Sequence, residues 1–247
     1  MTEPTRPEFH VLQADVFAAN TTLIVRDNTV VIVDAGVGVT GQVTSLIERN
    51  GWDPLGLFIT HGHVDHTWDA AELSAALDIP VLIHEADRYH LDDPFGIDPD
   101  FPERRDPSRM LVQAFASFGL RPDLFTTPNR IETLGSDAAV ESSIGQVWGG
   151  QWRWIAAPGH TPGATIYVFG DEADSAALPL ACTGDVLFAR SVGRTDLPGG
   201  DHRIMADTLE MLCTALRSET LLIPGHGPTT TMGDELTFNP YLRSGMM

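Results

Sequence analysis

Residues 60–73 read THGHVDHTWDAAEL, and they place three of the chain's nine histidines, with an aspartate, between positions 61 and 66. The preceding run LGLFIT (55–60) has the length and apolar character of a buried strand. One or two polar residues in a surface loop usually carry no function. This cluster follows a strand, however, and ligand sites in layered α/β proteins lie at the carboxyl ends of strands. The stretch therefore predicts a site at the edge of a sheet.

Strands and helices alternate on both sides of this cluster. Residues 21–34, TTLIVRDNTVVIVD, are two β-branched runs around an Asp-Asn pair and predict a hairpin. Residues 41–50 have helical spacing and stop before a glycine that is typical of a helix C-cap. A helix over 69–77 and a strand over 79–84 complete a β–α–β–α–β order.

The second half of the chain has the same style. It predicts strands at residues 130–134, 152–157, 164–169, 178–183 and 220–223. It also predicts one long helix over residues 202–216. Residues 92–120, a proline- and charge-rich segment followed by a predicted helix over 110–120, form an expected insertion that either overhangs the site or lies solvated on the surface. No linker divides the chain, so we expect one domain over residues 1–247, of α/β class, with packed sheets and outer helices.

Three later strands end in small-residue turns that each carry one side chain able to bind a metal. The turns are AAPGHTPGA with His160, ACTGDVLF with Asp185 and LIPGHGPTT with His226. Glycine and proline fix the backbone of such turns. A polar side chain on a rigid strand end suits metal binding, because the fold has already ordered it.

With the opening cluster, these turns predict seven metal ligands: His61, His63, Asp65, His66, His160, Asp185 and His226. Five imidazoles and two carboxylates are too many for one tetrahedral ion, but they suit two ions that share a carboxylate. We expect the ligands to divide into His61, His63 and His160 for one ion and Asp65, His66 and His226 for the other, with Asp185 bridging. Nitrogen and oxygen ligands without thiolate fit zinc, and also iron or manganese. A single histidine is more often packed in the core or exposed to solvent than bound to a metal. The joint pattern of these residues nevertheless favours a metal site.

The remaining histidines lack this context, and we assign no role to His10, His84, His90 or His202. Asp34 ends the strand VVIVD, where it is either a partner that orients the histidine loop or an ordinary strand-end aspartate.

Composition narrows the classes of function and location. The formal charge is −19, and all 15 basic residues are arginine, so we expect no binding to nucleic acid or to anionic membranes. No apolar run approaches the roughly 20 residues of a membrane span. The start, MTEPTRPEFHVLQ, does not resemble a secretory signal, which makes the cytoplasm the expected compartment. Cys182 and Cys213 lie in apolar contexts and are predicted as buried thiols, not a disulfide.

The motif His-x-His-x-Asp-His followed by a His, an Asp and a His resembles the metallo-β-lactamase superfamily. The similarity runs from VIVDAG, around Asp34, to PGHGPTT at 224–230. It implies an αβ/βα four-layer sandwich, in which two packed mixed β-sheets carry helices outside and a two-metal site lies at one edge. The motif is specific for the fold and says little about the substrate.

The stretch GDVLFARSVGRTDLPGGD (184–201) resembles the hydroxyacylglutathione hydrolases, the glyoxalase II group. That resemblance implies two divalent ions, most simply Zn²⁺, and hydrolysis of a hydroxyacyl thioester such as S-lactoylglutathione by a metal-bridging hydroxide. Asp65 and Asp185 are then the catalytic residues. Glyoxalase II proper adds a C-terminal helical domain whose basic residues hold glutathione. This chain ends soon after His226 and has no lysine, so another thiol carrier is an open alternative.

Two other activities of the superfamily match these residues less well. Secreted β-lactamases often carry a cysteine where this chain has Asp185, so antibiotic hydrolysis is not expected. Persulfide dioxygenases bind one iron and share a GRTD stretch, but their last histidine stands in a Pro-Ala-His-Asp-Tyr-like context and here it stands in PGHGPTT. The hydrolase is favoured over the dioxygenase. Arg194 either contacts a substrate carboxylate or pairs with Asp196 or Asp201.

Overall fold

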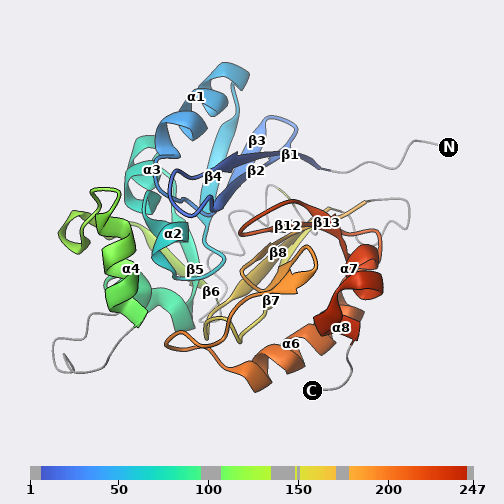
Figure 1. Ribbon diagram of the computed structural model, residues 1–247. Coiled ribbons are helices and arrows are strands. Elements are labelled where there is room, and N and C mark those ends of the chain that lie inside the picture. The colour runs from blue at the N-terminus through green and yellow to red at the C-terminus, as the bar shows by residue number, and fades with distance from the viewer. Residues whose placement is uncertain (1–6, 96–106, 135–147, 149–150, 171–177, 244–247) are drawn as a thin grey trace.

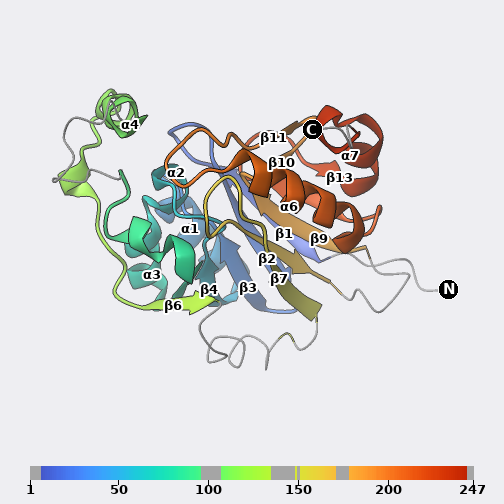
Figure 2. The same cartoon turned by 90° about the horizontal axis from the view of Figure 1, so that it is seen from below.

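Two β-sheets packed face to face, with helices on both outer faces, make up the computed structural model (Figures 1 and 2), which describes residues 7–95, 107–134, 148, 151–170 and 178–243. Both sheets mix parallel and antiparallel pairs. This architecture confirms the predicted α/β fold of two packed mixed sheets with outer helices. The expectation of one domain over the whole chain stays a prediction.

The N-terminal sheet carries the predicted site at one edge. Its spatial order follows the chain, with β1 (Glu8–Gln13), β2 (Asn20–Arg26), β3 (Thr29–Val33), β4 (Asp53–Phe58), β5 (Val81–His84) and β6 (Ile131–Leu134). Strands β1 to β3 pair antiparallel, and β3 to β6 pair parallel. The parallel strands therefore end at a common edge.

The helices on this sheet's outer face are α1 (Thr40–Asn50) and α3 (Ala70–Leu77). Gly51 ends α1 in the left-handed conformation, as the sequence predicts. The short α2 (Val64–Thr67) and the 3-10 helix η1 (Glu85–Leu91) were not predicted. Each follows a strand of the parallel part of the sheet.

The C-terminal sheet has the order β13-β12-β9-β8-β7. Its strands are β7 (Trp152–Ala156), β8 (Thr165–Phe169), β9 (Leu180–Gly184), β12 (Leu221–Pro224) and β13 (Thr230–Thr231). The neighbouring elements are β10 (Leu187–Phe188), β11 (Ser191–Val192), α6 (His202–Ala215), α7 (Met232–Phe238) and α8 (Pro240–Arg243). Strands β9 and β12 pair in parallel, so their carboxyl ends lie side by side.

Both faces of the central strands are buried, which explains their continuous apolar sequences. In β2, Ile24 packs between the sheets with Phe58 and Tyr167, whereas Leu23 and Val25 pack under the outer helices. A third apolar layer lies between the C-terminal sheet and α6. Cys182 is buried in the middle layer, as predicted, but Cys213 on α6 is only half-buried, which corrects that prediction; both thiols are free.

The predicted insertion lies partly outside the described residues, which leave out 96–106. Its helix, α4 (Pro107–Ala116), begins earlier than the predicted 110 and ends before 120, because proline is favoured in the first turn of a helix. The 3-10 helix η2 (Pro122–Leu124) follows. Phe115 of α4 packs on Val16 and Val64, beside the histidine loop. In the described part of the chain, no helix has the length and apolar character needed to cross a bilayer.

Candidate metal centre

All seven predicted ligands meet at one edge of the sandwich. His61 and His63 lie in the turn after β4, and Asp65 and His66 lie on α2. The three later residues each follow a strand of the C-terminal sheet, namely His160 after β7, Asp185 after β9 and His226 after β12. The two sheets thus each supply part of one cluster.

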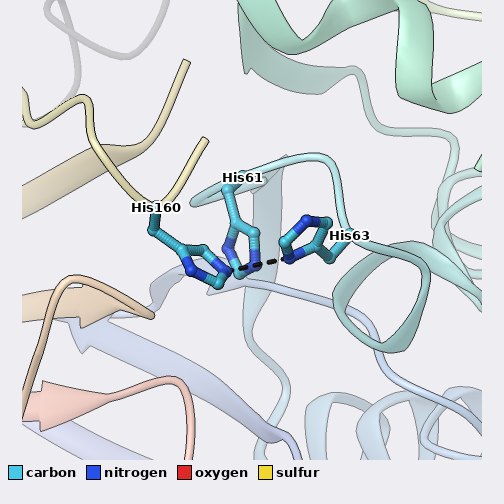
Figure 3. A group of neighbouring side chains, drawn as sticks. All are labelled: His61, His63 and His160. Carbon is cyan, nitrogen blue, oxygen red and sulfur yellow. Dashed lines mark hydrogen bonds between the residues drawn. The ribbon is translucent and has the colours of Figure 1, made fainter. Parts of the chain in front are cut away.

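His61, His63 and His160 form the first group, and their rings converge from two loops (Figure 3). Nε2 of His160 lies 2.9 Å from Nδ1 of His63. Two nitrogens that bind one ion at about 2.1 Å each lie about 3–3.4 Å apart. The spacing of this group therefore fits a shared cation.

Asp65, His66 and His226 form the second group. Nε2 of His226 lies 3.1 Å from Nε2 of His66 and 3.3 Å from Oδ2 of Asp65. These are again the separations of donor atoms around one ion. The donor atoms of His61, His66 and Asp185 also converge, so the seven residues form one continuous cluster. The assignment of these ligands to two ions stays a prediction.

Asp185 faces both groups. Its Oδ1 lies 3.4 Å from Nε2 of His66, and its Oδ2 lies 3.7 Å from Nε2 of His160 and 3.6 Å from Nε2 of His226. Asp185 Oδ1 and His61 Nε2 are buried without a hydrogen-bond partner among the described residues. Because a buried polar atom without a partner is costly, these two atoms are best explained as cation ligands. The residues present fit a metal site.

In four of the histidines, a hydrogen-bond partner holds the Nδ1 atom of the ring, so the Nε2 atom is directed at the cluster. His160 Nδ1 donates to the carbonyl of Arg194 at 2.7 Å, and His226 Nδ1 donates to the carbonyl of Phe17 at 3.1 Å. His66 Nδ1 lies 2.9 Å from Asp34, and His61 Nδ1 lies 3.0 Å from the hydroxyl of Thr60. Such partners fix the tautomer and orientation of metal-binding imidazoles.

Asp34 organises the histidine loop, which is the first of the two alternatives left by the sequence. Its carboxylate accepts hydrogen bonds from the Thr60 amide at 2.7 Å and the Thr60 hydroxyl at 2.8 Å, in addition to His66 Nδ1. The residue is 2% exposed and has a left-handed backbone (φ 61°). Backbone strain of this kind gathers at functional sites.

Asp87 ties together the two loops that carry the first group, and the sequence did not predict it. Fully buried on η1, its carboxylate accepts from the Gly62 amide at 2.9 Å, the Thr161 hydroxyl at 2.7 Å and the Gly163 amide at 2.6 Å. Its position shortly after a strand end is the only signal in the sequence. That signal is weak because its partners are mostly backbone amides far along the chain.

Two imidazoles of the first group, those of His61 and His63, are held neutral. Burial, and then the neighbouring His66 and His63, lower the pKa of His61 well below its usual value. Burial, and then His160, lower the pKa of His63 to about 3. At neutral pH both rings therefore offer lone pairs.

The second group has the opposite pattern. Burial acts to lower the pKa of His66, but Asp185, Asp65 and Asp34 outweigh it and raise that pKa well above its usual value. Burial acts to raise the pKa of Asp65 and of Asp185, but His66 and the other neighbouring histidines together outweigh it in both cases and lower the two pKa values. The carboxylates therefore stay charged and draw a positive charge into this group.

Glycine is required where the backbone passes the cluster. A Cβ on Gly225 would collide with Oδ1 of Asp185 and lie 2.7 Å from Cε1 of His66. The PGH turn that carries His226 can approach the other ligands only without a side chain at this position.

The guanidinium of Arg194 pairs with Asp196, and its Nε and Nη2 atoms each donate to a carboxylate oxygen at 2.7 Å. This is the ion-pair alternative; a contact to substrate stays a prediction. Of the histidines given no role, His10 pairs with Glu8, His84 caps η1 and His202 begins α6. His90 is different, because it lies buried beside the cluster.

A cavity of about 640 Å³ opens over the cluster, with His63, Asp65, His160, Asp185 and His226 in its lining. A family model for the metallo-beta-lactamase superfamily matches residues 14–226. The chain belongs to this superfamily. Membership makes it one of a group of metallo-hydrolases and agrees with the fold and with the metal site just described.

Relatives within the superfamily cover nearly the whole chain. An uncharacterized protein of Mycobacterium tuberculosis is 33% identical over 213 residues, 86% of each chain. The hydroxyacylglutathione hydrolase GloC of Haemophilus influenzae is 28% identical over 238 residues, 95% of this chain and 97% of the relative.

Solved structures of the superfamily agree with the fold. The BLEG-1 B3 metallo-beta-lactamase has a TM-score of 0.72 and 27% identity, and covers 96% of this chain and 100% of that one. TTHA1623 in a di-iron-bound form has a TM-score of 0.71 and 27% identity, and covers 94% of this chain and 99% of that one. These likenesses leave the metal and the substrate of this chain open.

Proposed function

We propose that this protein hydrolyses a thioester of the hydroxyacyl-thiol class, such as S-lactoylglutathione or an analogue with another thiol carrier. The observation that carries the proposal is the pair of ligand groups joined by Asp185. The hydrolase-like 184–201 stretch and the similarity to GloC support it. The proposal includes two divalent ions, zinc in the simplest case, with iron or manganese as alternatives.

Bound divalent ions would bring the pKa of a water molecule near neutrality and polarise the thioester carbonyl. The protein's own contribution is placement. Asp65 lines the cavity with 14% of its side chain exposed, so its carboxylate can orient the attacking water. Asp185 lies between the groups and sets their separation. A thiolate leaves readily, so the site needs no strong general acid.

An iron-dependent persulfide dioxygenase is the second candidate. Its support is the GRTD stretch at 193–196 and the occurrence of iron in the related TTHA1623. It needs one ion, however, and the ligands Asp65, His66 and His226 converge as closely as those of the first group. That second group favours the hydrolase.

The test is metal content by mass spectrometry on freshly purified protein, paired with two assays. A hydrolase with two equivalents of metal cleaves S-lactoylglutathione or another hydroxyacyl thioester and consumes no oxygen. Oxygen uptake with glutathione persulfide, together with one equivalent of iron, would establish the dioxygenase instead.

A further inference from the structure

The cavity over the cluster has two unlike sides. Its floor is the polar ligand set, and its wall is apolar, formed by Phe17, Phe95, Met110, Leu111, Leu197 and Pro198. The wall comes from four separate segments: the turn between β1 and β2, the residues after η1, the helix α4, and the loop between β11 and α6. A substrate whose carbonyl reaches the floor can therefore lay an apolar chain along this wall.

Several wall residues are exposed although they are large and apolar. Met110 is 70% exposed and Phe17 is 45% exposed. Phe17 is held by a left-handed backbone (φ 56°), packs edge-on against Phe115, and gives its carbonyl to His226. One strained turn therefore places both an aromatic wall residue and a ligand partner. Exposed apolar surface beside a functional cluster is typical of a binding site.

Charge also disfavours an anionic substrate arm. Apart from histidines, the only cation among the described lining residues is Arg194, and both of its hydrogen bonds go to Asp196. The chain as a whole carries −19, which repels a thiol carrier rich in phosphate or carboxylate groups.

We propose that this cavity selects thioesters whose acyl arm is apolar and several carbons long, on a carrier without many anionic groups. The inference rests on the proposed function, which it makes more specific. Each methylene that the wall buries should raise kcat/KM about threefold to fourfold, until the wall is filled.

The test is a series of N-acetylcysteamine thioesters with acetyl, butanoyl, hexanoyl and octanoyl arms, which keep the same leaving thiol. We expect kcat/KM to rise at least tenfold from acetyl to hexanoyl. In Ala114→Phe, a wall position on α4, the rise should disappear while acetyl hydrolysis continues. Ala116→Phe, the same change on an exposed position of α4, should keep the wild-type series.

A flat or falling series with measurable acetyl hydrolysis would overturn the inference and leave the proposed function standing. If no thioester is cleaved, the proposed function fails, and the inference about the wall is then tested by the affinity for uncleavable ligands. Isothermal titration with the S-hexyl and S-methyl thioethers of N-acetylcysteamine should give at least tenfold tighter binding of the hexyl compound to the wild type. Equal affinities would overturn it.

A separate observation concerns His90, also in the cavity lining. It is 6% exposed, and neither ring nitrogen has a hydrogen-bond partner among the described residues. Its ring stacks on Tyr89 at 4.1 Å and lies 5.8 Å from the ring of His63. A buried imidazole with two unused nitrogens, next to the floor of a cavity, is poised to bind a polar group of the ligand.

We infer that His90 hydrogen-bonds the hydroxyl group of a 2-hydroxyacyl substrate, again on the basis of the proposed function. The readout is the ratio of kcat/KM for 2-hydroxyhexanoyl and hexanoyl thioesters of one carrier. Wild type should favour the hydroxylated substrate, and His90→Phe should lower the ratio about tenfold. His90→Gln should restore part of it, and His202→Phe, on the exposed start of α6, should leave it unchanged.

A merely structural role for His90 would lower both rates equally and leave the ratio intact, which would overturn the inference. Melting temperatures of the variants show whether they are folded. If neither substrate is cleaved, titration with the corresponding thioethers, with and without the hydroxyl, replaces the rate ratio; an unchanged affinity ratio in His90→Phe would equally overturn it.

Discussion

At the scale of single residues, four of the five histidine ligands are each oriented by a second group. Thr60 shows this best, because its hydroxyl donates to Asp34 and lies 3.0 Å from His61 Nδ1. Asp34 in turn holds His66. A single buried carboxylate thus orients one histidine of each ligand group.

Asp185→Ala should abolish hydrolysis and reduce bound metal to below two equivalents, because it removes the carboxylate that faces both groups. Metal analysis and the thioester assay measure the two effects. Asp207→Ala, which removes an exposed carboxylate on α6, is the matched control. Full activity in the Asp185 variant would contradict a bridging role.

Asp34→Asn should weaken metal binding about 10–100-fold, because an amide cannot accept all three hydrogen bonds that orient Thr60 and His66. The buried donors left without a partner should also lower the free energy of unfolding by about 1–3 kcal/mol. Competition with a chelator and urea unfolding measure the two quantities. Unchanged metal affinity would show that Asp34 serves the fold alone.

At the scale of elements, the site depends on loops from two sheets being held in one geometry. The first group needs the turn after β4 and the turn after β7, which have no strand pairing with each other. Asp87 on η1 supplies the connection through hydrogen bonds to both turns. An element outside the ligand set therefore decides the ligand geometry.

Asp87→Ala should lower the free energy of unfolding by at least about 2 kcal/mol, because buried backbone donors lose their acceptor. It should also reduce metal at the first group more than at the second. Thr161→Val removes one of the three donors and should show a smaller effect in the same direction. Equal metal loss from both groups in Asp87→Ala would argue against a local tether.

At the scale of the whole molecule, the buried histidines of the ligand groups make the stability of the protein depend on pH. In the metal-free protein, His63 has a pKa of about 3, below the usual value of about 6.5 for an unfolded histidine. The unfolded state therefore binds more protons between these values, and stability falls as the pH falls through this window.

We predict that the free energy of unfolding of the metal-free protein drops by about 1 kcal/mol per pH unit on account of His63 between pH 6 and pH 4. His61, whose pKa is also lowered, adds to the slope. His66 has a raised pKa, so its contribution is fully present below pH 6.5 and is lost only at higher pH. Urea unfolding at several pH values, on wild type and His63→Gln, measures the slope. An equal slope in both proteins would contradict the assignment.

Local sequence patterns predicted most of the fold and the seven clustered residues. The hairpin of β2 and β3, the helix α1 with Gly51 and the strands β4, β7 and β12 follow from periodicity and turn chemistry. The sequence missed β1, the short α2 and the roles of Asp87 and His90. These depend on contacts with distant segments, which leave little local signal.

The order of the residues by itself determined which side chains can bind metal and that they follow strands, because strand and turn signals are local. Only the tertiary structure decided how closely the ligands converge, which partner holds each imidazole and what lines the cavity. Those outcomes depend on how two sheets pack, since packing brings together residues that are more than a hundred positions apart, such as His66 and His226.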